Sequence, residues 1–227
     1  MTTIASNLQA VRTAIKAAAA GAGRHADDVS LLAVSKTFAQ AAVRDACQAG
    51  QTRFAESYVQ EALKKITALQ DLPIEWHFIG PVQSNKTRAI AEHFAWVHSV
   101  DRLTIAERLS AQRPAHLPPL QVCLQVNISG EDSKSGVSPD QLSALARAVA
   151  KLPGLKLRGL MAIPAPVDDV AAQRLPFAQL RELLDRLNQQ GLNLDTLSMG
   201  MSHDFSAAIA EGATMVRIGS AIFGQRE

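Results

Sequence analysis

Residues 31–36 read Leu-Leu-Ala-Val-Ser-Lys, a short apolar run that ends on a hydroxyl and an amine. The apolar residues are continuous rather than alternating with polar ones, a pattern typical of a parallel strand covered on both faces. We therefore expect Lys36 to stand at the C-terminal end of the first buried strand of a parallel sheet.

Seven more apolar runs of strand length follow, separated by segments with helical patterning. The eight expected strands are Leu31–Ser35, Thr52–Ala55, Glu75–Ile79, Trp96–Val100, Leu120–Ile128, Leu155–Ala162, Thr196–Met199 and Met215–Ile218. Ahead of them, an amphipathic helix is expected over the first 20 residues. This order predicts a closed (β/α)8 TIM barrel with an extra N-terminal helix, in one domain over residues 1–227. A doubly wound open sheet is the alternative.

Residues that favour helix starts and helix ends delimit several of the expected helices. Ser138-Pro-Asp-Gln141 predicts a capping box with proline at the first helical position. Asp101 is expected to cap a helix that runs to Pro114. A leucine stripe from Leu180 to Leu187 predicts a helix that ends at Gly191.

Composition narrows the classes of protein. Of 227 residues, 47% are hydrophobic and 19% charged, and the net charge of +2 is spread without basic or acidic blocks. Nucleic acid and membrane surfaces are therefore poor partner predictions. The first 20 residues lack the pattern of a signal peptide, and Cys47 and Cys123 are far apart. A cytoplasmic protein without disulfides is expected.

Polar residues follow the ends of several expected strands. Lys36 follows the first strand, Ser57 the second, Met201–Ser202 the seventh, and Arg217–Ser220 spans the end of the eighth. In a (β/α)8 barrel the active face lies at the C-terminal ends of the strands. We therefore expect these residues to meet at one mouth of the barrel.

The loops after the seventh and eighth strands indicate an anion site. Gly200, Ser202, Gly219 and Ser220 permit close backbone approach, and helix N-termini there favour negative charge. The alternative is that Ser202 is an N-cap and Gly219 a packing point. Asp204 argues against an anion unless its carboxylate points away.

Lys36 suits covalent chemistry with an aldehyde. Burial lowers the pKa of an amine and makes it nucleophilic. The alternative is a lysine that extends from the strand end to solvent. Other motifs are incomplete: Gly21-Ala-Gly23 lacks a third glycine, Gly200–Asp204 ends in Asp where a nucleophile elbow has Gly, and the six histidines lack metal-ligand spacing.

Long stretches of the chain resemble the YggS/PROSC family of pyridoxal phosphate homeostasis proteins. The matching stretches are 31–37, 76–86, 125–129, 159–161, 197–204 and 216–219. The resemblance implies a fold like the barrel domain of alanine racemase, with pyridoxal 5′-phosphate held as a Schiff base on Lys36. It also implies that Ser202, Gly219 and Ser220 grip the phosphate and that Arg217 lies against the phosphate or the pyridine edge. Met201 is expected in the same site.

One stretch departs from the family. Where the family reads Phe-Gly-Glu-Asn-Tyr, this chain reads Phe54-Ala-Glu-Ser57-Tyr58. Ser57 is shorter than asparagine and offers one hydroxyl in place of an amide. Any cofactor contact that the family's asparagine makes is therefore in question here.

The resemblance implies a protein that keeps or delivers the cofactor in intracellular vitamin B6 homeostasis without enzymatic turnover. Apo-enzymes that use the cofactor are expected recipients, and a monomer is expected. The alternative is an amino-acid racemase, whose second base is a tyrosine of a second domain. Tyr58 is the one tyrosine here, and Arg217 disfavours a protonated pyridine. A pure interaction module would need an inert Lys36.

Overall fold

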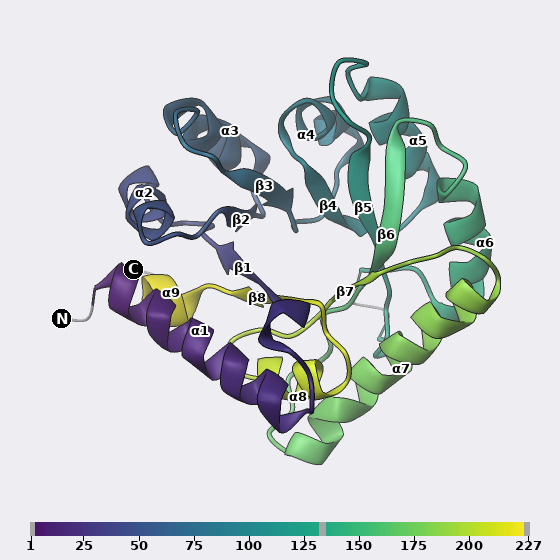
Figure 1. The fold of residues 1–227 in the computed structure, drawn as a ribbon. Helices are drawn as coiled ribbons and strands as arrows, with labels where there is room; N and C mark the ends of the chain where they lie inside the picture. Colours follow the sequence, from purple (N-terminus) through teal and green to yellow (C-terminus); the bar gives the residue numbers. More distant parts are fainter. Residues whose placement is uncertain (1–2, 132–134, 225–227) are drawn as a thin grey trace.

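The strands close into a barrel in the computed structural model, which describes residues 3–131 and 135–224. Each strand is parallel to its neighbours, and β8 returns to pair with β1 (Figure 1). The strands are β1 Ser30–Val34, β2 Arg53–Glu56, β3 Glu75–Phe78, β4 Trp96–Val100, β5 Leu120–Gln125, β6 Leu155–Met161, β7 Thr196–Ser198 and β8 Met215–Ile218. The predicted barrel is therefore confirmed, and the open sheet is wrong.

Strand positions agree with the prediction, with one clear difference in length. β4 and β8 have the predicted bounds, whereas β5 ends at Gln125 instead of Ile128. Beyond β5 the chain turns: Val126 forms a bridge with Val137, and the Asn127 side chain accepts from the backbone of Gly130 at 3.1 Å. The apolar run at this strand thus continues past the sheet into a loop.

Helices cover the outside of the barrel. They are α1 Ile4–Gly21, α2 Gln40–Gln48, α3 Val59–Ala68, α4 Thr87–His93, α5 Leu103–Gln112, α6 Pro139–Val149, α7 Val170–Gln189, α8 Phe205–Ala210 and α9 Ser220–Phe223, with short 3-10 turns at Ala26–Asp28 (η1) and Ser84–Lys86 (η2). The predicted N-terminal helix, α1, lies along α8 and α9 (Figure 1). Its Asn7 donates to the backbone of Ile222 at 3.0 Å. The main apolar core lies between this helical layer and the strands.

The start of α6 is confirmed, with Ser138 at the N-cap and proline after it, but the capping bonds predicted for Ser138 and Asp101 are wrong. Ser138 stands at the N-cap of α6, but its hydroxyl makes no capping bond and instead contacts Asp140. Asp101 accepts from Arg102, which is itself the N-cap residue of α5. Short polar side chains compete among several local partners, so spacing alone does not decide which bond forms. The predicted stop of α7 is confirmed, because Gly191 follows it with φ of 89°.

The lumen of the barrel is partly polar. Two small apolar clusters lie inside it, one around Leu32 and Met215 and the other around Trp96 and Met161. Buried polar side chains of His77, His98, Ser198 and Arg217 are also present. In the part of the chain that the structure describes, no helix has the length and apolar character needed to cross a membrane.

Candidate functional site

All seven residues predicted for the cofactor site line one cavity at the C-terminal mouth of the barrel. Its volume is about 440 Å³. The lining residues are Val34, Lys36, Ser57, Ile79, Ile163, Met201, Ser202, His203, Arg217, Gly219 and Ser220. The prediction that these strand ends meet is therefore confirmed, while their role in binding a cofactor stays a prediction.

The cavity has the polarity of an anion site. Lys36 and Arg217 are basic, and none of the eleven lining residues is Asp or Glu. The hydroxyls of Ser202 and Ser220 lie 3.4 Å apart at the loops after β7 and β8. The lining therefore offers hydrogen-bond donors and positive charge together, as a phosphate requires.

The alternative considered for Ser202 does not hold, whereas Gly219 is a close packing point as that alternative expected. The N-cap residue of α8 is Asp204, so the N-cap role considered for Ser202 is wrong. The Asp204 carboxylate accepts from the backbone of Met201 at 2.6 Å, within its own loop. Asp204 is not among the residues that line the cavity, so its charge does not occupy the expected anion site.

A buried ionic network holds the backbone on both sides of Lys36. Lys65 of α3 donates to the carbonyl of Ser35 at 2.7 Å and to Glu56 at 2.8 Å. Lys65 also donates to Glu61 at 2.6 Å, and the same Glu61 oxygen accepts from the backbone of Thr37 at 2.6 Å. Thr37 has φ of 72°, a conformation that needs such support in a β-branched residue. The network thus fixes where β1 ends and Lys36 emerges.

The positive charge of Lys65 and the negative charges of Glu56 and Glu61 attract one another in this network, although burial removes Lys65 and Glu56 from water. Lys65 is 4% exposed, and Glu56 is fully buried. Burial raises the pKa of the Glu56 carboxyl, against the opposing effect of hydrogen bonds from Lys65 and Ser35. Sequence reasoning missed Lys65. The available signal was its position on the apolar face of α3, in step with buried Val59 and Ala62.

Close packing at one glycine positions Ser57. A Cβ on Gly80, at the end of β3, would lie 2.1 Å from the carbonyl oxygen of Ser57. A second close approach occurs at Gly219, where a Cβ would lie 2.9 Å from the carbonyl oxygen of Val34. Glycine at these positions therefore lets the loops after β3 and β8 approach the residues that line the cavity.

Arg217 is held by neutral acceptors. Its Nη1 donates to the carbonyl and to the hydroxyl of Ser198, at 2.6 and 2.8 Å, and its Nη2 donates to the carbonyl of Ala162 at 2.9 Å. Burial lowers the pKa of Arg217 to about 10, so the side chain remains a cation at neutral pH. The lumen therefore presents a fixed positive charge at the floor of the cavity.

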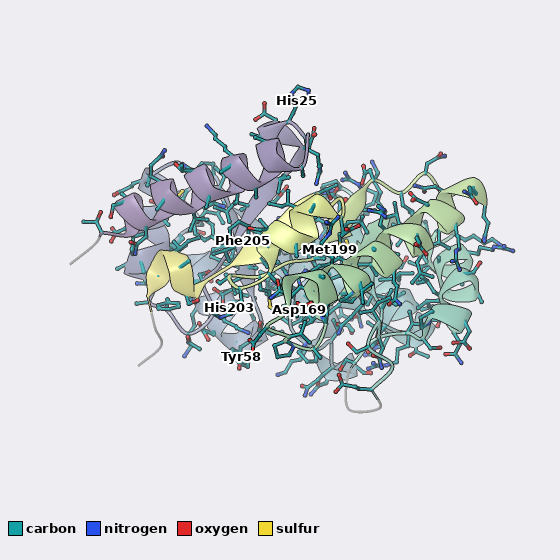
Figure 2. The ribbon with its side chains drawn as sticks, turned by 90° about the horizontal axis from the view of Figure 1, so that it is seen from below. His25, Tyr58, Asp169, Met199, His203 and Phe205 are labelled. Carbon is teal, nitrogen blue, oxygen red and sulfur yellow. The ribbon has the colours of Figure 1, made fainter. Side chains whose placement is uncertain are left out.

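Tyr58, the residue weighed as a second base, lies outside the cavity. Figure 2 shows Tyr58 and His203 on one side of the molecule and His25 on the opposite side. Tyr58 is 56% exposed at the N-cap of α3 and does not line the cavity. Among the described residues, no group of His, Cys, Asp and Glu is arranged to bind a metal.

Comparison with known proteins identifies the family. The model of the alanine racemase N-terminal domain family matches residues 6–227. The pyridoxal phosphate homeostasis protein of Pseudomonas aeruginosa is 65% identical over 227 residues, covering 100% of this chain and 97% of that protein. The structure of PipY of Synechococcus elongatus with PLP bound superposes with a TM-score of 0.86 at 39% identity, over 98% of this chain and 100% of that chain.

A more distant likeness concerns the fold alone. Alanine racemase of Corynebacterium glutamicum is 19% identical with a TM-score of 0.68, over 96% of this chain and 62% of that chain. Fold and family model thus define the class, a (β/α)8 barrel of the alanine racemase N-terminal type. Within that class, the chain belongs to the YggS/PROSC family.

Proposed function

We propose that this chain binds pyridoxal 5′-phosphate in the Lys36 cavity and takes part in the homeostasis of that cofactor. The observation that carries the proposal is one cavity whose described lining combines a primary amine, two paired hydroxyls and a buried arginine with no Asp or Glu. The names of the relative from Pseudomonas aeruginosa and of the PLP-bound PipY structure support it.

Each of the seven predicted site residues has a proposed task. Lys36 attaches the cofactor covalently through a Schiff base, and Ser202, Ser220 and the backbone at Gly219 bind its phosphate. Arg217 provides the fixed positive charge at the floor. Ser57 and Met201 form the walls on either side. When bound, the cofactor would supply an electrophilic carbon for reaction with amines.

We propose that the protein holds and delivers the cofactor without turning over a substrate. None of the described residues that line the cavity is a carboxylate able to keep a pyridine nitrogen protonated, and exposed Tyr58 is not placed as a second base. Apo-enzymes are the proposed recipients, and the proposed working form is a monomer with residues 1–227 acting as one domain. The free thiols of Cys47 and Cys123 support a cytoplasmic site of action.

Chemical trapping tests the binding proposal. After incubation with pyridoxal 5′-phosphate and borohydride reduction, mass spectrometry is expected to place the adduct on Lys36. The Lys36→Ala variant is expected to lose both the imine absorbance and the adduct, while a Lys86→Ala control keeps them. An adduct on Lys65 or Lys86 in the native protein would contradict the assignment.

Proton exchange tests the holder against the racemase. Proton NMR of L- and D-alanine in heavy water with the loaded protein is expected to show no loss of the α-proton signal. Cofactor is expected to pass to an apo-enzyme under the same conditions. Exchange at about 1 per second or faster, absent in Lys36→Ala, would establish an enzyme instead.

A further inference from the structure

A continuous chain of hydrogen bonds runs through the barrel lumen from the candidate site toward the opposite mouth. Arg217 Nη1 donates to Ser198 Oγ at 2.8 Å, and Ser198 Oγ lies 2.8 Å from His98 Nδ1. His98 Nε2 lies 2.9 Å from His77 Nδ1, and His77 Nε2 lies 3.0 Å from Glu75 Oε1. We call these five residues the lumen chain; they join β8, β7, β4 and β3.

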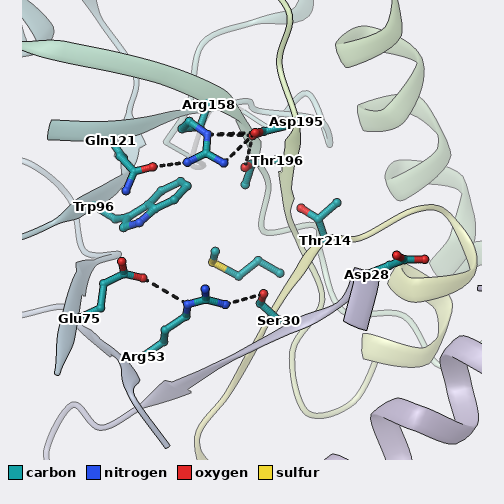
Figure 3. Close-up of a pocket in the computed structure, with 11 residues that line it drawn as sticks. Asp28, Ser30, Arg53, Glu75, Trp96, Gln121, Arg158, Asp195, Thr196 and Thr214 are labelled. Carbon is teal, nitrogen blue, oxygen red and sulfur yellow. Dashed lines mark hydrogen bonds and ion pairs between the residues drawn. The ribbon is translucent and has the colours of Figure 1, made fainter. Parts of the chain in front are cut away.

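Glu75 ends the lumen chain in a second cavity, of about 350 Å³, at the N-terminal ends of the strands. Figure 3 shows Glu75 paired with Arg53 in this cavity, and Asp195 paired with Arg158 across from them. The two acids thus have similar surroundings. Glu75 contacts the buried His77, whereas Asp195 contacts Arg158 and Thr196. Asp195 is therefore a matched control for Glu75.

The two ends of the lumen chain determine which atoms donate. Arginine can only donate, so Ser198 Oγ accepts at the Arg217 end. Glu75 is held as an anion, because the hydrogen bond from His77 lowers the pKa of its carboxyl and Arg53 lies 3.2 Å away. An ionised carboxylate can only accept, so His77 Nε2 carries a proton and donates to Glu75.

The two histidines carry this order through the barrel. Both rings are fully buried, and burial lowers the pKa of each, so both are neutral. A neutral imidazole has one donor and one acceptor. His77 Nδ1 therefore accepts from His98 Nε2, and His98 Nδ1 accepts from the Ser198 hydroxyl. Every hydrogen bond then points the same way, from Arg217 to Glu75.

We propose that Glu75 is a positioning residue for Arg217, acting from the opposite mouth of the barrel by fixing the tautomers of His77 and His98. With this order, the Ser198 hydroxyl turns its lone pair toward Arg217 and its proton toward His98. Three of the five guanidinium hydrogens are then bound by Ser198 and Ala162. Nε–H and one Nη2 hydrogen have no acceptor among the described residues and are available to a ligand.

No carboxylate among the described residues is hydrogen-bonded to Arg217. The acceptors that the described residues offer Arg217 are two carbonyls and a hydroxyl, all uncharged. The lumen chain ends on the Glu75 carboxylate, at the opposite mouth of the barrel. His77 stacks on Trp96, with ring centroids 5.4 Å apart, and this contact fixes the plane of the His77 imidazole. Arg217 therefore stays oriented by uncharged acceptors, while the nearby Asp204 acts on it through its charge without a hydrogen bond.

Histidine tautomers provide the direct test, and they need no cofactor. Two-bond ¹H–¹⁵N correlation of ¹⁵N-histidine protein at neutral pH is expected to show His77 and His98 as neutral Nε2–H tautomers. The exposed histidines, His25, His93, His116 and His203, are assigned by single substitution. An Nδ1–H tautomer or an imidazolium at either lumen position would overturn the proposal.

Glu75→Ala and Asp195→Ala form the matched pair. Glu75→Ala is expected to disturb both tautomers and raise the Kd for pyridoxal 5′-phosphate about two- to tenfold, the effect of one net hydrogen bond. Asp195→Ala is expected to change neither. Unchanged tautomers in Glu75→Ala, or equal effects of the two variants, would overturn the proposal. Only the affinity measurement rests on the proposed function: a native protein that binds no cofactor contradicts that function, and the tautomers alone then decide the role of Glu75.

Discussion

The ammonium of Lys65 lies 2.7 Å from the carbonyl oxygen of Ser35, the residue that precedes Lys36. This bond and those to Glu56 and Glu61 tie α3 to the end of β1. Lys65 is therefore a structural lysine beside the proposed reactive one. The two have different positions: Lys65 is buried beside Glu56 and Glu61, whereas Lys36 lines the cavity at the mouth of the barrel.

Replacement of Lys65 is expected to destabilise the fold strongly. Lys65→Met leaves Glu56 buried without its cation, and breaking a buried pair in this way costs about 3–5 kcal/mol. Lys64→Met, at the exposed neighbouring position, is expected to stay within about 0.5 kcal/mol. Denaturant unfolding measures both. Equal stability of the two variants would show that the network contributes little.

Removal of the Ser202 hydroxyl is expected to weaken retention of the cofactor through its phosphate. Ser202→Ala is expected to cost about 1.5–3 kcal/mol of binding free energy, the scale of a hydrogen bond to a charged group. Ser206→Ala, on exposed surface of α8, serves as the control. Equilibrium dialysis with pyridoxal 5′-phosphate and with pyridoxal measures the effect. Equal affinity for the two aldehydes would exclude a phosphate site at these loops.

Gly80→Ala is expected to displace Ser57. The added Cβ would meet the Ser57 carbonyl oxygen at 2.1 Å, and relief of such a clash costs about 1–3 kcal/mol. Gly21→Ala is the control, because no atom lies within 4 Å of the added Cβ there. Thermal unfolding and cofactor titration are both expected to separate the two variants. Wild-type behaviour of Gly80→Ala would show that the loop after β3 can move freely.

Stability is expected to fall as pH drops below about 6.5, the ordinary pKa of histidine. Burial lowers the pKa of His77 and of His98 in the folded protein, so the unfolded chain takes up protons first. Above about pH 6.5 the two histidines leave the free energy of unfolding at its full value. Below that pH they lower it by up to about 1.4 kcal/mol per pH unit each.

Urea unfolding of cofactor-free protein at a series of pH values measures this slope. His98→Gln is expected to reduce the slope of stability against pH by the share of one proton, up to about 1.4 kcal/mol per pH unit. His93→Gln, at an exposed position, serves as the control. A stability that does not vary between about pH 7 and pH 5 would contradict neutral histidines in the lumen.

Local pattern was enough to predict the barrel and the position of Lys36. Continuous apolar runs separated by helical stretches report the burial of each segment, and in a parallel barrel every strand presents its C-terminal end to the same mouth. The seven predicted site residues therefore meet in one cavity, although the sequence placed each of them only along its own strand or loop. The failed caps at Ser138 and Asp101 show that side-chain bonding is less predictable than burial.

Contacts across the barrel depended on the tertiary structure. His98 and Ser198 are 100 residues apart in sequence, and Lys65 reaches Ser35 from a different element. Their meeting requires the register between strands and the closure of the sheet, which no local pattern encodes. Alternation in β3 and β4 places Glu75, His77, Trp96 and His98 inside the barrel, but it does not show that the two imidazoles touch. The sequence by itself therefore determined the strands and the mouth at which Lys36 emerges. The closed barrel decided which buried polar groups are paired, because an interior without water makes an unpaired polar group costly.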